Sequence, residues 1–277
     1  MSEYQYYEFQ TVDRRLSETE MRELRAYSTR ARITPTSFVN DYSFGSFKGD
    51  PDAWMEKYFD GFLYVANWGT HEFKLRLSSK LLSVNTARLY CSGDAASVRE
   101  KAGKLIFTFL SEEEGGGEWV HGEGILSSLL PLRAELARGD LRSLYLGWLL
   151  NAQAGALGQD VPEPPVPPNL GKLSSALSSL ADFLRIDPDL VAVAGQRSPR
   201  TKSVPASRKA VAAWVASLPA TEKNEMLVRL MAEEDSHIGM ELSSRFNRQR
   251  IADSPPAEGP RRTVADLLTA AGMEAGE

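Results

Sequence analysis

The aromatic residues of this chain are concentrated at its N-terminal end. Twenty of the 25 precede residue 120. Because large rings supply much of the surface that a compact core buries, this distribution predicts a well-packed N-terminal domain. A proline-rich stretch at 162–168 separates that domain from an aromatic-poor remainder. We expect the remainder to form smaller helical units on flexible connections.

Length and cysteine content narrow the class of protein. A chain of 277 residues can bury roughly 70 to 75 per cent of the surface that its unfolded form exposes, so it can be stable without a metal or a disulfide. The single cysteine, Cys91, cannot form an intramolecular bridge, which favours a reducing compartment and predicts a cytoplasmic location. No signal peptide is recognisable, and no apolar run approaches the roughly 20 residues of a membrane span. We therefore expect no membrane partner.

Strand and helix patterns alternate in the first part of the chain. Residues 4–12 carry rings on both faces of a predicted strand, which suits a sheet covered on two sides or an edge strand that binds a partner. Ser17 and Glu20 form a capping-box pattern that begins a helix. A second strand is predicted at 32–42, either at a sheet edge or starting after Pro35, because proline cannot donate to a ladder.

Asp50 and Pro51 mark the start of the next helix, because aspartate accepts hydrogen bonds from first-turn amides and proline needs no partner there. Its apolar residues continue to Val65, and we expect it to end at Gly69 as a central core helix. A strand is predicted at 72–77, and a hairpin follows with strands at 97–101 and 105–110. Two helices are then predicted, at 124–137 and 140–154. The domain over residues 1–160 is therefore predicted to be α+β, with an antiparallel or mixed sheet and helices on one face.

The rest of the chain is predicted to consist of helical units between linkers. We expect a proline-rich connector at 161–171, a short helical extension at 172–196 and a basic linker at 197–206. A small helical bundle should follow at 207–251, and a linker with a terminal helix at 252–277. The terminal helix, with Val264, Leu267 and Leu268 on its apolar face, is too short to be stable alone, so it must dock or fray. Docked on another protein, it would be a partner-binding helix.

The densest chemical cluster is the acidic, glycine-rich loop at 112–124. Its side chains could hold a divalent cation or transfer protons, with Glu118, His121 and Glu123 as the candidate residues. A run of this kind is more often simply solvated. The usual motifs for phosphate binding, zinc proteases, hydrolase nucleophiles and redox cysteine pairs are missing from the sequence. We therefore expect no cofactor and no metal, and we favour a protein that is not an enzyme.

Basic residues gather in and after the linker that precedes the helical bundle. Five of them, and no acidic residue, lie between positions 190 and 221: Arg197, Arg200, Lys202, Arg208 and Lys209. A second group follows, with Arg245, Arg248 and Arg250. Such residues can bind phosphates or an acidic partner. Because no aromatic residues interleave with the first group for base stacking, nucleic acid is a less expected ligand than protein.

Seven short segments resemble a bacterial family of hypothetical proteins. They are YYEFQ at 6–10, ITPTSFVN at 33–40, FKGDP at 47–51, YFD at 58–60, ANWGT at 66–70, FLRIDPDL at 183–190 and RRTVADL at 261–267. Similar chains often continue after the last motif into a long charged helix. The family has no assigned activity, so the resemblance implies no catalytic residue. It implies that the terminal helix could begin an extension that contacts partners.

Three hypotheses about function follow from the sequence. The leading one is a non-catalytic cytoplasmic adaptor that binds another protein and whose linkers, at 196–207 and 252–262, could be cut to release that partner. The alternative is an enzyme with a dispersed site around Glu118, His121 and Glu123. The third is a nucleic-acid-binding protein that uses the basic stretch at 197–209.

Overall fold

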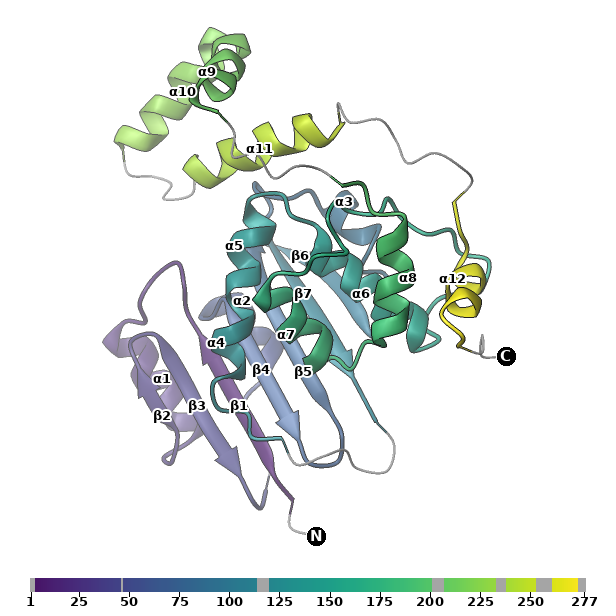
Figure 1. Ribbon diagram of the computed structural model, residues 1–277. Helices are drawn as coiled ribbons and strands as arrows, with labels where there is room; N and C mark the ends of the chain where they lie inside the picture. The colour runs from purple at the N-terminus through teal and green to yellow at the C-terminus, as the bar shows by residue number, and fades with distance from the viewer. Residues whose placement is uncertain are drawn as a thin grey trace.

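A seven-stranded antiparallel sheet organises the N-terminal part of the protein in the computed structural model (Figure 1). The structure describes residues 3–45, 47–113, 120–200, 207–232, 238–252 and 261–273. The strands are, in sheet order, β2 (Arg32–Thr34), β3 (Ser37–Tyr42), β1 (Gln5–Gln10), β4 (Gly61–Ala66), β5 (His71–Ser78), β7 (Lys104–Ser111) and β6 (Ala96–Lys101). The predicted α+β class, followed by a helical C-terminal region, is confirmed.

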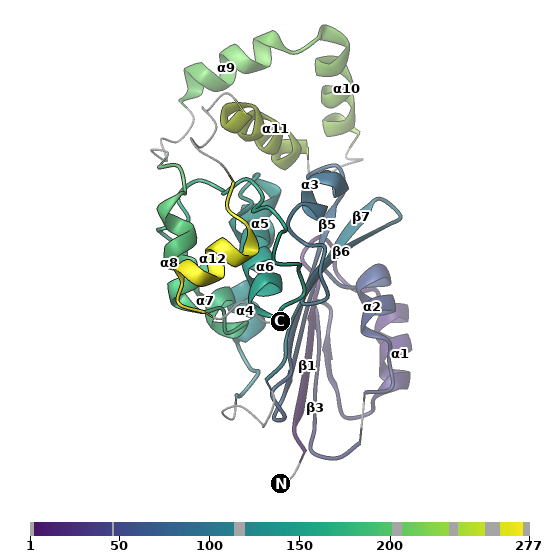
Figure 2. The ribbon, with the colours of Figure 1, turned by 90° about the vertical axis from the view of Figure 1, so that its right-hand side faces the viewer.

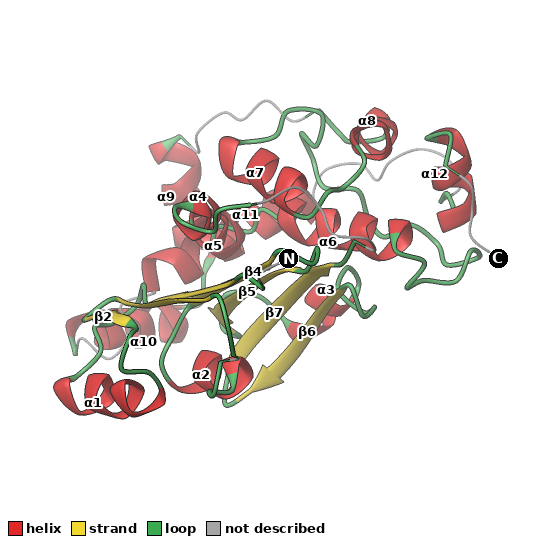
Figure 3. Cartoon of the chain, turned by 90° about the horizontal axis from the view of Figure 1, so that it is seen from below, coloured by secondary structure: helices red, strands yellow, loops and turns green. Residues whose placement is uncertain are grey.

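Helices cover both faces of the sheet, whereas the sequence predicted them on one (Figures 2 and 3). Two helices lie on the first face, α1 (Glu18–Tyr27) and α2 (Pro51–Lys57). Helix α3 (Val84–Arg88) lies beside β6. The second face is covered by the helices that follow the sheet, including α4 (Ile125–Leu129), α5 (Pro131–Ala137), α6 (Arg142–Gln153), α7 (Ser175–Phe183), α8 (Pro188–Gln196) and α12 (Val264–Ala270). We call residues 3–200 and 261–273 the body.

Two apolar clusters occupy the two faces because strand residues alternate between them. On the first face, the Phe9 ring lies 4.5 Å from that of Phe62 and 5.0 Å from that of Trp54, measured between centroids. On the second face, Phe73 and Phe107 belong to a larger cluster that also includes residues of α4 to α8 and α12. The rings on both faces of β1 therefore fit a sheet that is covered on two sides, the first of the two alternatives considered for this strand.

The helix that begins at Pro51 is shorter than predicted. It ends at Lys57, and Phe62, Leu63 and Val65 lie in β4 instead. A continuous apolar run does not distinguish a buried helix from a buried strand, and this run belongs to a strand with apolar cover on both faces. In the last turn of the helix, the carbonyl of Met55 accepts a hydrogen bond from Arg76 Nη1 of β5 at 2.9 Å.

Proline also breaks two other predicted elements. The strand expected at 32–42 is a hairpin, in which Pro35 and Thr36 form the turn between β2 and β3. The helix expected at 124–137 is divided into α4 and α5 at Pro131, which takes the first position of the second helix. The hairpin of β6 and β7 is confirmed, with Ala102 and Gly103 at positive φ in its turn.

The proline-rich segment at 161–171 is held against the body by side chains on either side of it in the sequence. Tyr90 Oη donates to the carbonyl of Pro165 at 2.8 Å, and Ser198 Oγ donates to that of Pro167 at 2.7 Å. The helices that follow, α7 and α8, share the large apolar cluster with the sheet. The predicted helical extension is therefore packed into the core of the body.

Three further helices project from the body at the top of Figure 1: α9 (Arg208–Ser217), α10 (Ala220–Met231) and α11 (Ile238–Ala252). We call residues 207–252 the arm. No described helix of the body or the arm is long and apolar enough to cross a membrane.

Candidate functional site

The arm rests on the body through α11. Ser244 is fully buried, and its Oγ donates to the carbonyl of Leu81 at 3.0 Å. Asn247 Nδ2, one turn further along, donates to the carbonyl of Arg138 at 2.9 Å. These bonds join one face of α11 to a loop after β5 and to the end of α5, so α11 is the base of the arm.

Helix α10 lies on α11 through its charged face. Glu222, Met226 and Arg229 follow one another at helical spacing and face α11. Glu222 pairs with Arg245, and Arg229 Nη2 lies 2.8 Å from Glu241 Oε2. Met226, between the two ion pairs, is the buried apolar residue of this helix.

Helix α9 is attached to α11 by one aromatic side chain. The Trp214 indole donates from Nε1 to Gln249 Oε1 at 2.9 Å, and its ring lies 5.4 Å from that of Phe246. No residue of α9 is buried, although all of its residues are among those the structure describes.

Six apolar side chains of α9 and α10 are exposed to solvent, whereas Met226, Ile238 and Phe246 of the arm are buried. On α10, Leu227, Val228, Leu230 and Met231 are 57, 63, 58 and 84% exposed, and on α9, Val211 and Val215 are each 38% exposed. We call these six residues the outer face of the arm. A surface helix normally turns its apolar side inward, and α10 does the reverse, with ion pairs inside and apolar side chains outside.

Burial of the outer face against another surface would stabilise α9 and α10. Helices of 10 to 12 residues are marginal in water, and most of their stability in proteins comes from packing an apolar side against a neighbour. On α10, Leu227, Leu230 and Met231 lie at helical spacing, and an exposed apolar surface of this kind commonly marks a binding site for another protein. The sequence predicts a small helical bundle over 207–251, in which Leu227, Leu230 and Met231 would be expected to face other helices, but the structure leaves them exposed.

Of the candidate catalytic residues of the acidic loop, the two that the structure describes do not lie in a buried site. His121 and Glu123 are both exposed; the His121 ring lies 6.4 Å from that of Tyr4, and Glu123 Oε1 lies 3.7 Å from Arg32 Nη2. Glu118 lies outside the described residues. Among the described residues, no group of histidine, cysteine and acidic side chains is arranged to hold a metal ion.

The basic residues are divided between the body and the arm. Arg197 and Arg200 are exposed after α8, while Arg208 and Lys209 are exposed at the start of α9. Lys202 lies outside the described residues, as do the side chains of Arg248 and Arg250. Arg245, from the second basic group, is paired with Glu222.

The terminal helix is docked on its own body. Val264, Leu267 and Leu268 are 1, 0 and 5% exposed and belong to the large apolar cluster. A helix that buries its apolar face in this way does not offer it to a partner, so the partner-binding interpretation of these three residues does not fit the structure.

Buried ionisable groups elsewhere in the body act as links between elements. Arg185 Nη2 lies 3.0 Å from His71 Nε2, and because arginine only donates, Nδ1 of the imidazole carries the proton and donates to the Phe183 carbonyl at 2.8 Å. Burial lowers the pKa of His71, against the opposing effect of that carbonyl. Asp60, also buried, pairs with Arg76 at 2.8 Å. The first pair joins residues 114 positions apart, and the second joins β5 to the segment between α2 and β4.

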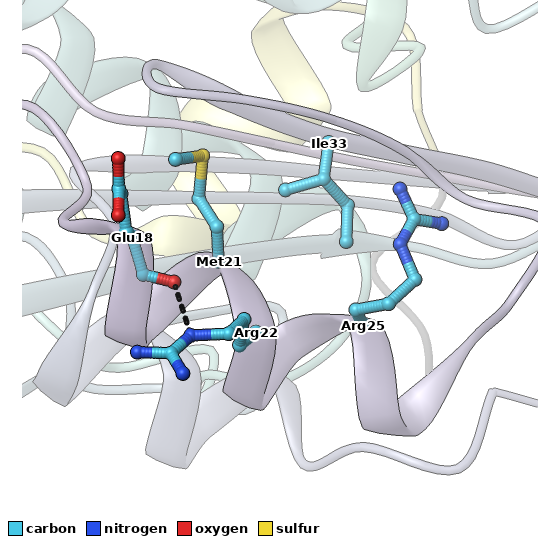
Figure 4. A pocket seen from close by; sticks show the side chains of 5 residues that line it. All are labelled: Glu18, Met21, Arg22, Arg25 and Ile33. Carbon is cyan, nitrogen blue, oxygen red and sulfur yellow. Dashed lines mark hydrogen bonds between the residues drawn. The ribbon is translucent and has the colours of Figure 1, made fainter.

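A shallow pocket lies between α1 and β2, lined by Glu18, Met21, Arg22, Arg25 and Ile33 (Figure 4). Its two guanidinium groups donate to the backbone of their own segment. Arg22 Nε bonds the carbonyl of Glu18 at 3.4 Å, and Arg25 Nη1 bonds that of Ala31 at 2.6 Å. The pocket is thus a weaker candidate site than the arm.

No protein-family model, characterised protein or solved structure matches this chain. The interpretation of function therefore depends on the geometry described above.

Proposed function

We propose that this chain is a non-catalytic cytoplasmic adaptor that binds another protein through the outer face of the arm. The observation that carries the proposal is the reversed polarity of α10, whose ion-paired side faces α11 and whose apolar side faces solvent. A partner that supplies an apolar groove or a helix face would bury these side chains, in the manner of helix-in-groove recognition.

Burial of the outer face would contribute favourably to binding. Burying an aliphatic side chain fully contributes about 1.5 to 3 kcal/mol, so the four residues of α10, each more than half exposed, could contribute several kcal/mol before the costs of association. A few well-packed residues usually supply most of the affinity of an interface. The cytoplasmic location is supported by the buried free thiol of Cys91.

Affinity purification from the native host tests the proposal. The full chain is compared with Leu227→Glu/Met231→Glu, which places charge on the outer face, and with Phe44→Glu as a matched control. Phe44 is 82% exposed on the body, so the control changes a similarly exposed apolar residue away from the arm.

We expect a protein that the full chain and Phe44→Glu retain in stoichiometric amount and that the double variant does not. The complex should also slow amide exchange over residues 220–231. Equal recovery by all three chains, or protection confined to the body, would contradict the proposal.

A further inference from the structure

The chain returns to the body after the arm by adding backbone bonds to residues 159–163. The amide of Glu163 donates to the carbonyl of Arg262 at 2.7 Å. The amide of Val264 donates to Val161 at 3.0 Å, and that of Ala265 donates to Gln159 at 3.0 Å. A bridge between Pro162 and Thr263 completes the pairing. This is the pattern by which an extended peptide is recognised along an exposed backbone edge.

A buried ion pair fixes the register of the returning segment. Arg262 donates to both oxygens of Glu163, from Nε at 2.9 Å and from Nη2 at 2.7 Å. Glu163 is 3% exposed and also accepts a hydrogen bond from Tyr145 Oη. Arg262 Nη1 reaches the carbonyl of Val193 in α8 at 3.0 Å. A bidentate guanidinium–carboxylate pair at this depth selects arginine over lysine, because only arginine presents two parallel donors.

Apolar side chains complete the contact. Helix α12 begins with a capping box, in which Thr263 Oγ1 accepts from the amide of Asp266 and the Asp266 carboxylate accepts from that of Thr263. The cap directs Val264, Leu267 and Leu268 into the large apolar cluster, with α6 and α8 alongside. The contact thus combines a backbone edge, a buried ion pair and a buried apolar contact.

We propose that residues 159–163, together with α6 and α8, form a peptide-binding groove whose ligand is the chain's own segment 261–273, held by non-covalent contacts independently of the covalent connection. The groove recognises an arginine followed by an aliphatic residue two positions later and a leucine pair at the next helical turn. A single cut between the arm and this segment therefore leaves the segment in its groove.

The experiment uses the full chain with a specific protease site introduced within residues 253–260. After cleavage, native mass spectrometry and gel filtration measure whether the C-terminal fragment stays with the rest of the protein. Two variants of the fragment are compared, Arg262→Ala and the matched control Arg261→Ala. Arg261 is exposed and adjacent in sequence, so the pair separates the buried guanidinium from charge as such.

We expect the unmodified and Arg261→Ala fragments to remain bound after cleavage and dilution. Removing one partner of a buried ion pair costs about 3 to 5 kcal/mol, so the Arg262→Ala fragment should bind at least about a hundredfold more weakly. Loss of the unmodified fragment on dilution, or equal retention of the two variants, would overturn the proposal.

A second measurement does not require a variant protein to fold. A fluorescent synthetic peptide of residues 261–273 is added in excess to the cleaved, unmodified protein, and its uptake is followed by anisotropy. The peptide should replace the fragment, and the Arg262→Ala peptide should not. Uptake of neither peptide, or of both equally, would count against a groove with the stated specificity.

Discussion

The buried carboxylate of Asp60 offers a direct test of how the sheet, α2 and the loop after β1 are held together. The residue is 0% exposed. One of its oxygens accepts from Arg76 Nε and Nη2 at 3.0 and 2.8 Å, and the other accepts from the amides of Val12 and Asp13 at 2.6 and 3.0 Å. Four donors therefore depend on one side chain.

The Asp60→Ala substitution removes all four acceptor contacts. Leaving one charge of a buried pair without its partner costs about 3 to 5 kcal/mol, and each orphaned amide adds about 1 to 3 kcal/mol unless water reaches it. The expected loss, roughly 4 kcal/mol or more, is a large fraction of the 5 to 15 kcal/mol by which domains are stable. The Asp60→Asn variant keeps an acceptor of the same shape and should lose less.

Urea unfolding, followed by tryptophan fluorescence and circular dichroism, measures the free energy of unfolding of each variant. Asp52→Ala is the matched control, because Asp52 also pairs with a strand cation, Lys74, but is half exposed. The control should lose about 1 kcal/mol or less, because the Asp52 carboxylate is half exposed and the buried Lys74 keeps Glu72 as a second partner at 2.8 Å. A loss below 1 kcal/mol for Asp60→Ala would refute the reasoning.

The same carboxylate predicts a loss of stability in acid. Burial opposes ionisation of Asp60, but Arg76 and the two amides outweigh it, so the pKa of Asp60 is lowered in the folded chain. A group with a depressed folded pKa contributes stability that is complete above its unfolded value, about 3.9, and that is lost as the pH falls through the folded value. Asp60→Asn should show a smaller slope of stability against pH below about 4.

Three further predictions follow from other parts of the structure. The pKa of His71 is lowered in the folded chain, so the unfolded chain takes up a proton at higher pH than the folded chain. The free energy of unfolding should therefore fall as the pH drops below about 6.5. His71→Gln should reduce that slope in urea titrations between pH 7.5 and 5.5. A Cβ at Gly122 would lie 2.1 Å from the buried Tyr6 ring. Gly122→Ala should therefore lower the free energy of unfolding by about 1 to 3 kcal/mol. An unchanged value would mean that the segment around Gly122 does not pack on that ring. Leu227→Ser and Met231→Ser, on the outer face, should change the free energy of unfolding by no more than about 0.5 kcal/mol while weakening partner binding. A clear loss of stability would mean that these side chains are packed inside the fold.

Local chemistry explains which elements the sequence could predict. Ser17 and Asp50 cap their helices through hydrogen bonds to amides within three residues, and these contacts need no information from the rest of the chain. The same is true of the turn at Gly139, whose φ of 89° favours glycine. The run after Pro51 was predicted wrongly because its structure depends on distant residues: the neighbours of β4 decide between strand and helix. The elements divided at Pro35 and Pro131 differ for a local reason, since proline itself ends one segment and begins the next.

The candidate site lay beyond sequence reasoning for a related reason. The apolar period of α10 predicts a helix but not which side of it meets α11, because that depends on ion pairs with Glu241 and Arg245 in another helix. The pair of Glu163 and Arg262 joins residues 99 positions apart and has no local signature. Its members were visible only as one residue of a proline-rich segment and one of a short motif.

The proline-rich segment has a consequence for how the arm is attached. Near one end, Asn169 donates its amide to the carbonyl of Pro199 at 2.9 Å, just before the chain leaves for the arm, and near the other end Glu163 receives the chain on its way back. The chain therefore leaves for the arm and returns from it at two points that are both hydrogen-bonded to the proline-rich segment. The place at which the arm is attached is thus set by the body, and α11 adds its own bonds to Leu81 and Arg138.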